Sequence, residues 1–201
     1  FRVGIKHGFE VDGIYEGCGG LVEGKIARLG YRDVSEILAK GGTILESSRL
    51  PEFTLDEVQD RAINNLKEHE IDSLVVIGGD GSYRGAQALA KKGINCIGIP
   101  GTIDNDINGT DFTIGFDTAL NTIIGLVDKI RDTASSHART FIIEAMGRDC
   151  GDLALWAGLS VGAETIVVPE VKTDIKEIAD KIEQGIKRGK KPSIVLVAEG
   201  C

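Results

Sequence analysis

The sequence predicts an α/β fold of two Rossmann-like, three-layer α/β/α domains with mostly parallel sheets, both incomplete. Short apolar runs alternate along the chain with longer amphipathic segments. Runs such as 74–77 and 193–198 are continuously apolar, which is typical of strands buried on both faces of a parallel sheet. The chain begins at Phe1 without a methionine and ends just after an apolar run, so we expect an internal piece of a longer protein.

Composition and charge exclude several classes of protein. The chain has 201 residues, 42% of them hydrophobic, and a formal net charge of -8, which disfavours a general nucleic-acid binder. No apolar run approaches the roughly 20 residues that a membrane helix needs, and no signal peptide is visible. The four cysteines form no CxxC pair that would indicate zinc. We therefore expect a cytoplasmic protein that binds neither nucleic acid nor membrane.

In the first half of the chain the pattern predicts helices and strands in turn. A capping box of Thr54 and Glu57 predicts the start of a helix at this point. The expected helices are the end of one at 2–7, a short one at 34–40, then 54–68 and 83–91. The expected strands are 9–15, 43–45, 74–77 and 96–99, and residues 17–20 are expected to form a glycine-rich loop.

The second half continues the alternation, and we place a domain boundary near Gly115, giving domains 1–115 and 116–201. The expected helices are 116–133, 151–159 and 173–188, and the expected strands are 139–144, 165–168 and 193–198. Four isoleucines in the last helix, at 175, 178, 182 and 186, recur at helical spacing, which predicts that they face inward.

The segment Gly78–Ser82 (GGDGS) follows an apolar strand and precedes a helix. Glycines let a phosphate approach the backbone amides at a helix N-terminus, and Asp80 could hold Mg²⁺ on a bound nucleotide. The alternative is an ordinary tight turn capped by Ser82.

A second polar segment, Pro100–Asp106, follows the next strand. In open α/β sheets ligands bind at such carboxyl ends, so both segments should serve one site. Asp104 could take a proton from a hydroxyl group while Asp106 orients it or binds a metal. The alternative is an Asx turn with both acids capping local amides, which is credible for Asp106. Arginine suits phosphate, yet Arg49, Arg131, Arg139 and Arg148 could each be solvated surface groups.

The chain resembles the bacterial ATP-dependent 6-phosphofructokinases over nearly its whole length. The resemblance is carried by four runs, of which the second and third are the most specific: GGDGS (78–82), PGTIDNDINGTDFTIGFDTALNT (100–122), DKIRDTASSHART (128–140) and MGRDCGDLALWAG (146–158). It implies transfer of a phosphoryl group from Mg-ATP to the 1-hydroxyl of fructose 6-phosphate. The ATP-binding domain would be 1–115 and the sugar-phosphate-binding domain 116–201.

By this resemblance Asp104 is the general base, Arg148 stabilises charge on the transferred group, and Thr102 assists. Asp80 holds Mg²⁺. The implied ATP contacts are Arg49, Leu50, Gly79, Asp80, Gly81 and Ser82. The implied sugar-phosphate contacts are Thr102, Ile103, Asp104, Arg139, Met146, Gly147, Arg148 and Glu199, with Arg139 reaching the site of a neighbouring subunit in a homotetramer.

The resemblance also implies an effector site for ADP as activator and phosphoenolpyruvate as inhibitor. Its expected residues are Arg2, the segment 31–36, Arg131, Gly162, Ala163, Glu164, Arg188, Lys190, Lys191 and Pro192. Pro192 replaces a common histidine there, and Cys18 replaces a frequent tyrosine near the nucleotide, so the chemistry is expected more firmly than the regulation.

Two other functions stay open. Pyrophosphate-using relatives carry an acid at the position of Gly81 and a lysine at that of Gly101, and glycine at both positions favours ATP because it leaves room for a nucleotide. The other alternative is a regulatory protein that binds nucleotide without turnover. The presence of Asp104 and Arg148, the implied catalytic residues, argues against it.

Overall fold

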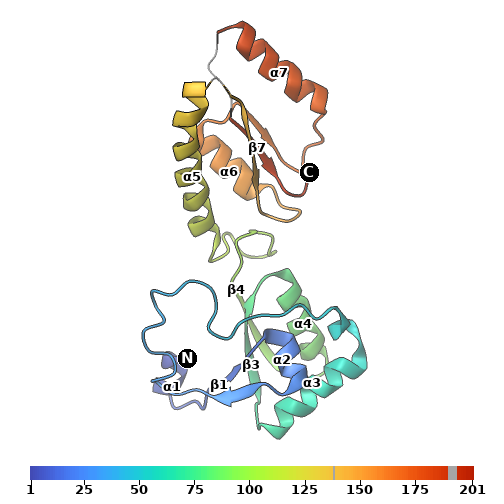
Figure 1. Ribbon diagram of the computed structural model, residues 1–201. Coiled ribbons are helices and arrows are strands. Elements are labelled where there is room, and N and C mark those ends of the chain that lie inside the picture. Colours follow the sequence, from blue (N-terminus) through green and yellow to red (C-terminus); the bar gives the residue numbers. More distant parts are fainter. Residues whose placement is uncertain (138, 190–193) are drawn as a thin grey trace. The chain divides into compact units, whose positions relative to one another are not determined.

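The structure is a computed structural model that describes residues 1–137, 139–189 and 194–201 (Figure 1). The chain forms two compact units, the first made of Phe1–Ile77 and Gly81–Ile99, the second of Gly78–Asp80 and Pro100–Cys201. Helices and strands alternate, so the α/β class is confirmed. The domain boundary near Gly115 stays a prediction for the domains of a whole protein.

Unit 1 is built around a core of aliphatic side chains that includes Leu66 and Leu89. Its elements are α1 (Arg2–Lys6), β1 (Asp12–Ile14), α2 (Gly17–Glu23), β2 (Ile26–Arg28), η1 (Pro51–Thr54), α3 (Asp56–Glu68), β3 (Ser73–Gly78), α4 (Asp80–Lys91) and β4 (Asn95–Pro100). Strands β1 and β2 pair antiparallel, and β3 pairs with β4. Gly78–Asp80 and Pro100, at the ends of these elements, belong to unit 2.

Four expectations for unit 1 are wrong. Residues 17–20 are helical rather than a loop, and at Gly20 a Cβ would lie 1.7 Å from the Tyr15 carbonyl oxygen, so this position requires glycine. Residues 34–40 form turns and 43–45 no strand. Thr54 donates to the Pro51 carbonyl at 3.1 Å instead of capping α3, whose N-cap is Leu55. The Thr54 hydroxyl makes a local bond to the backbone in place of the predicted capping box.

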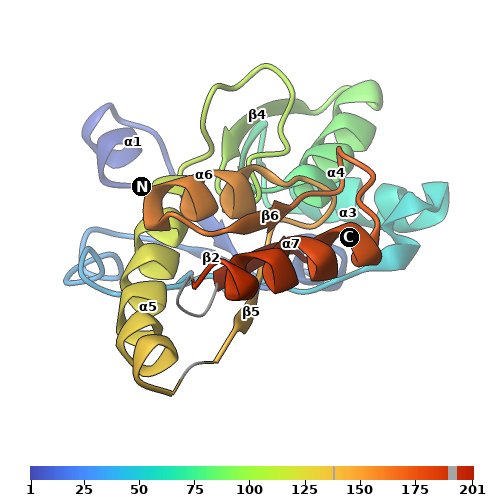
Figure 2. The ribbon, with the colours of Figure 1, turned by 90° about the horizontal axis from the view of Figure 1, so that it is seen from above.

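Unit 2 contains a parallel sheet in the order β5-β7-β6. Its elements are α5 (Phe116–His137), β5 (Phe141–Ala145), α6 (Asp152–Val161), β6 (Thr165–Val167), α7 (Ile175–Lys187) and β7 (Ile194–Ala198). Central strand β7 is buried along most of its length, and α6 packs on it with Ala154 and Ala157 fully buried. Helices α6 and α7 lie on opposite sides of this sheet (Figures 1 and 2).

Burial differs from expectation at two places. Helix α7 has no fully buried residue. Ile175 and Ile186 are 80% and 59% exposed, while Ile178 and Ile182 are half-buried, so its isoleucine face is only partly covered among the described residues. Strands β3, β4 and β5 each have exposed apolar side chains, whereas β7 and the short β6 are buried or half-buried along their length, as predicted. Among the described residues no helix is long and apolar enough to cross a membrane.

Candidate active site

The loop of residues 100–115, between β4 and α5, is closed by backbone hydrogen bonds. The amide of Ile114 donates to the Pro100 carbonyl and that of Gly115 to the Thr102 carbonyl, both at 3.0 Å. A Cβ on Gly115 would lie 2.9 Å from the Thr102 oxygen, so only glycine permits this approach. The two ends of the loop are therefore fixed side by side, with the polar residues 102–106 between them.

Asp104 and Asp106 flank a residue with an unusual backbone. Asn105 has φ 59°, in the left-handed region, which asparagine tolerates better than most residues. Its side chain donates to Asp152 Oδ2 at 2.7 Å and accepts from the amide of Thr113 at 3.0 Å. The segment is thus neither extended backbone nor an Asx turn in which both acids cap local amides.

Arg148 brings the two polar segments together. Its guanidinium donates to Asp106 Oδ2 at 2.6 Å and forms an ion pair with Asp80 Oδ2 at 3.5 Å. These residues and Asp104 all belong to unit 2, and we call Asp80, Asp104, Asp106 and Arg148 the carboxylate–arginine cluster. The prediction that the ends of two neighbouring strands serve one site agrees with this geometry.

Glu199, just after β7, holds the segment that carries Arg148. One carboxylate oxygen accepts from the amide of Gly147 at 2.9 Å and also from that of Arg148. Both residues have positive φ, 145° and 54°, so the segment turns sharply after β5. The Glu199 carboxylate therefore fixes a strained turn, and these two amide bonds lower its pKa.

The charges of the cluster shift its pKa values in a way that suits proton transfer. Burial, followed by the negative charge of Asp106, raises the pKa of Asp104, while Arg148 opposes the rise. The pKa of Arg148 is raised chiefly by its hydrogen bond to Asp106, so the guanidinium stays charged. A carboxylate with a raised pKa accepts a proton more readily near neutral pH.

The donor set suits a magnesium ion shared with a phosphate ligand. Mg²⁺ is commonly held by one or two carboxylates, with waters and substrate phosphates completing its shell. Asp80 offers a carboxylate, and Asp106 Oδ1 is buried without a hydrogen-bond partner among the described residues. No group of three or more His, Cys, Asp or Glu residues in the described chain forms a metal site of its own.

Several predicted residues lie elsewhere or belong to secondary structure rather than loops. Asp80–Ser82 form the first turn of α4 instead of a loop. Gly79 lies against Thr102, whose Cβ would be 3.3 Å from an added Cβ. Arg49 is exposed and Leu50 packs against the core of unit 1, and we make no statement on their position relative to the cluster. Met146 is 60% exposed, and Arg139 is exposed between α5 and β5.

Sequence reasoning missed the supporting residues. Asn105 and Asp152 were not singled out, nor was Glu170, which accepts from the amide of Gly151 at 2.8 Å at the start of α6. The signal for Asn105 was its position between two aspartates in a predicted turn, where left-handed backbone favours asparagine. For the Asp152 partner, 47 positions away, we find no signal in the sequence.

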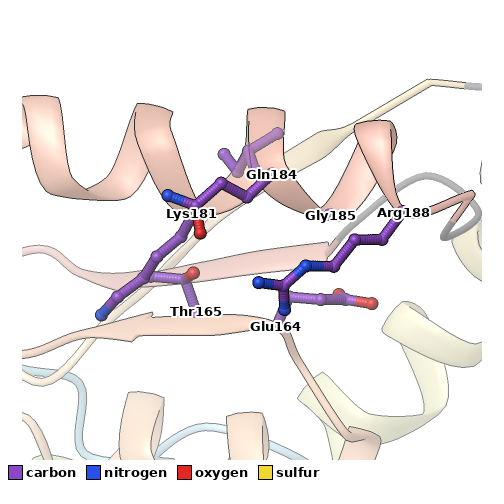
Figure 3. A pocket seen from close by; sticks show the side chains of 7 residues that line it. Glu164, Thr165, Lys181, Gln184, Gly185 and Arg188 are labelled. Atoms are coloured by element: carbon purple, nitrogen blue, oxygen red, sulfur yellow. The ribbon is translucent and has the colours of Figure 1, made fainter.

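The predicted effector residues of unit 2 surround the ends of α6 and α7. Arg131 donates to the Val161 carbonyl, Gly162 ends α6 with φ 61°, and Glu164 accepts from the Ile194 amide at 2.9 Å. A cavity of about 220 Å³ is lined by Glu164, Thr165, Lys181, Ile182, Gln184, Gly185 and Arg188 (Figure 3). Arg2 lies in unit 1, and Lys190, Lys191 and Pro192 lie outside the described residues.

Comparison with known proteins gives the family. A family model described as phosphofructokinase matches residues 1–201. The chain belongs to the phosphofructokinase family. ATP-dependent 6-phosphofructokinases of Staphylococcus aureus, for example those of strains JH9 and Newman, are 73% identical over 202 residues. The match covers 100% of this chain and 63% of each relative, so the chain spans less than two thirds of their length.

Solved phosphofructokinase structures share the fold. Phosphofructokinase of Pichia pastoris in the T-state aligns with TM-score 0.91 and 38% identity, over 100% of this chain and 24% of that one. The Saccharomyces cerevisiae structure aligns with TM-score 0.87 and 37% identity, over 100% and 31%. A pyrophosphate-dependent phosphofructokinase from Marinobacter aquaeolei, with TM-score 0.80 and 23% identity over 100% and 54%, shows likeness of fold alone.

Proposed function

We propose that the protein containing this chain transfers a phosphoryl group from Mg-ATP to the 1-hydroxyl of fructose 6-phosphate, giving fructose 1,6-bisphosphate and ADP. The observation that carries the proposal is the carboxylate–arginine cluster, in which a carboxylate of raised pKa lies near a charged arginine and two further acids. The 73% identity to ATP-dependent 6-phosphofructokinases supports the same reaction.

In the proposed reaction Asp104 accepts the proton of the sugar hydroxyl as its oxygen bonds to the γ-phosphorus and the bond to the ADP oxygen breaks. Arg148 donates to the oxygens of the transferred group, where negative charge is concentrated. Thr102, whose hydroxyl accepts from the Asp104 amide at 3.3 Å, keeps the base in place. Glu199 holds Gly147 and Arg148, so it contributes to both sugar binding and the position of Arg148.

Asp80 and Asp106 would hold the magnesium ion, since both present carboxylate oxygens near Arg148 and one oxygen of Asp106 has no partner within the described residues. Bound there, Mg²⁺ would neutralise charge on the nucleotide phosphates. The ion pairs of Arg148 with the same two acids imply that the arginine changes partners when substrates bind.

The choice of donor rests on Gly81. A Cβ added there would meet no described atom within 4 Å, so the backbone at the first turn of α4 leaves space for a nucleotide phosphate. Pyrophosphate is the alternative donor, because the sequence resemblance extends to relatives that use pyrophosphate.

The deciding experiment supplies full-length protein with fructose 6-phosphate, Mg²⁺ and either ATP or pyrophosphate, and measures fructose 1,6-bisphosphate, ADP and orthophosphate. We expect bisphosphate and ADP with ATP only. Product with pyrophosphate only would establish the alternative donor. Tight ATP binding without product from either donor would instead establish a regulatory nucleotide-binding protein.

Assembly and regulation form the second part of the proposal. We propose a homotetramer in the cytoplasm in which Arg139, exposed here, contacts sugar phosphate bound by a neighbouring subunit. The exposed apolar side chains of α6, including Trp156 at 47% and Leu159 at 65%, supply a surface that association would bury. Replacing Arg139 with Ser should raise the KM for fructose 6-phosphate strongly, and an unchanged KM would contradict this role.

We further propose that ADP or phosphoenolpyruvate binds at the cavity between β6 and α7. Lys181 and Arg188 supply positive charge, and the buried hydroxyl of Thr165 has no hydrogen-bond partner in the described part of the chain. Together they offer donors to an anionic effector (Figure 3).

A further inference from the structure

Asn105 occupies a position that no catalytic role accounts for. It lies between Asp104 and Asp106 with left-handed backbone, and both ends of its amide group are used. The nitrogen donates to Asp152 Oδ2 at 2.7 Å and the oxygen accepts from the amide of Thr113 at 3.0 Å. The side chain therefore ties three segments of unit 2 together.

The partner of Asn105 is on the most firmly packed helix of unit 2. Asp152 begins α6, and the next residues, Leu153 and Ala154, are both 0% exposed. An acidic residue at this end of a helix is also favoured by the helix dipole. A hydrogen bond to Asp152 consequently fixes Asn105 relative to the core rather than to another loop.

The aspartates on either side of Asn105 depend on this attachment. Asp106 holds Arg148 through Oδ2, while its buried Oδ1 has no partner in the described residues. The negative charge of Asp106 acts on the carboxylate of Asp104 and raises its pKa. A left-handed residue between them sets the directions in which both side chains leave the backbone, so a change at Asn105 would rotate both.

We infer that Asn105 and Asp152 form a brace that positions Asp104 and Asp106 for the reaction. Asn105 is on this view a positioning residue, which acts through its neighbours without touching substrate. The inference rests on the proposed function for its kinetic consequence, but the brace itself can be observed without activity.

The first test replaces Asn105 with Gly in the full-length protein, since glycine adopts the left-handed backbone without strain but makes neither side-chain bond. Because small misplacements of reacting groups are costly, we expect kcat to fall by about 10- to 100-fold. The KM values for ATP and fructose 6-phosphate should change little, because the contacts that bind substrate remain.

Asp152 gives an independent set of variants. Asp152→Ala removes the acceptor and should reproduce the fall in kcat, whereas Asp152→Asn keeps an acceptor oxygen and should restore most of it. Combining Asn105→Gly with Asp152→Ala should add little to either single change, because both break the same bond. These variants test the brace even if Asn105→Gly does not fold.

Glu170→Ala is the matched control. Glu170 accepts from the Gly151 amide at the same end of α6 but makes no bond to the 100–115 loop that the structure records. Its loss removes one hydrogen bond at the start of α6 and should leave kcat within about twofold, because the bonds of Asn105 and Glu199 that hold the cluster remain.

Amide hydrogen exchange at Thr113 provides the readout without activity, because this amide donates to Asn105. Exchange should quicken in Asn105→Gly and Asp152→Ala and not in Glu170→Ala. Unchanged kcat in Asn105→Gly and Asp152→Ala, or an equal loss in Glu170→Ala, would overturn the inference. Absence of bisphosphate formation by the unsubstituted protein would refute the proposed function instead, while the exchange result still decides whether the brace exists.

Discussion

Unit 2 contains two regions that differ in what holds them in place. The segments of the carboxylate–arginine cluster, residues 100–115 and 146–148, are held by the hydrogen bonds of Asn105 and Glu199. Helix α7 is regular and capped by Asp174, yet buries none of its isoleucines. The difference teaches that side-chain hydrogen bonds hold the residues of the cluster in place, whereas no fully buried side chain holds α7 against the rest of the described chain.

The largest effect should come from removing the base. Asp104→Ser in the full-length protein should lower kcat by about 10²- to 10⁴-fold, the usual contribution of a general base, with modest change in KM. Because burial disfavours ionised Asp104 and raises its pKa, the substitution should not lower the melting temperature at pH values at which this carboxyl group is ionised. A change on α7, Glu183→Ser, serves as the control. A kcat for Asp104→Ser within tenfold of the original would remove Asp104 from the mechanism.

The second largest difference between the two regions should be in the free energy of unfolding lost when an apolar side chain is shortened. Leu153→Ala, in the first turn of α6 where the side chain is fully buried, should reduce the free energy of unfolding by about 2–5 kcal/mol, as for other fully buried leucines. Ile175→Ala on α7, where the side chain is 80% exposed, should change it by less than about 0.5 kcal/mol. Urea denaturation of both variants measures the contrast, and equal losses would show that α7 is covered in the whole protein.

For regulation, a change on α7 should matter more than its small effect on stability suggests. Arg188→Ala, at the end of α7, should abolish activation by ADP, an effect that for allosteric ligands is typically about 5- to 150-fold in affinity. Basal kcat without effector should stay within about twofold. The measurement is the rate against fructose 6-phosphate with and without ADP. Activation retained in full by this variant would exclude the cavity as the effector site.

The smallest expected effect is a shift in pH dependence. Since the pKa of Asp104 is raised, in part by Asp106, activity should fall, as the pH is lowered, at a higher pH than for an ordinary aspartate. Asp106→Asn removes that negative charge and should move this acid limb of kcat/KM to lower pH. As a control, the pH profile of Glu183→Gln on α7 should match that of the unsubstituted protein. A shift of the acid limb to higher pH in Asp106→Asn would show that Asp106 does not raise the pKa of Asp104.

Much of the fold could be predicted from the sequence, because apolar periodicity reports burial directly. The helix beginning at Phe116 and the strand at 74–77 were placed within a few residues. The helix through Gly17–Gly20 could not be, since glycine is unfavourable within helices. The close approach of Gly20 to the Tyr15 carbonyl, which requires glycine at that position, shows only in the structure.

The candidate site divides in the same way. Asp80 and Asp104 were predictable because acids after parallel strands point to a ligand site. The bonds of Asn105 to Asp152 and of Glu199 to Gly147 join residues 47 and 52 positions apart, and spacing along the chain carries no information on such pairs. The exposure of Ile175 could not be predicted from the sequence either, because an amphipathic pattern shows that a face is apolar without showing what covers it.

The two ion pairs of Arg148 bear on how substrate would enter. An incoming phosphate meets an arginine already engaged by Asp80 and Asp106, so binding exchanges one set of charges for another instead of creating a first attraction. Added salt weakens both sets. Affinity for the nucleotide should therefore decline less steeply with ionic strength than it would at a bare guanidinium.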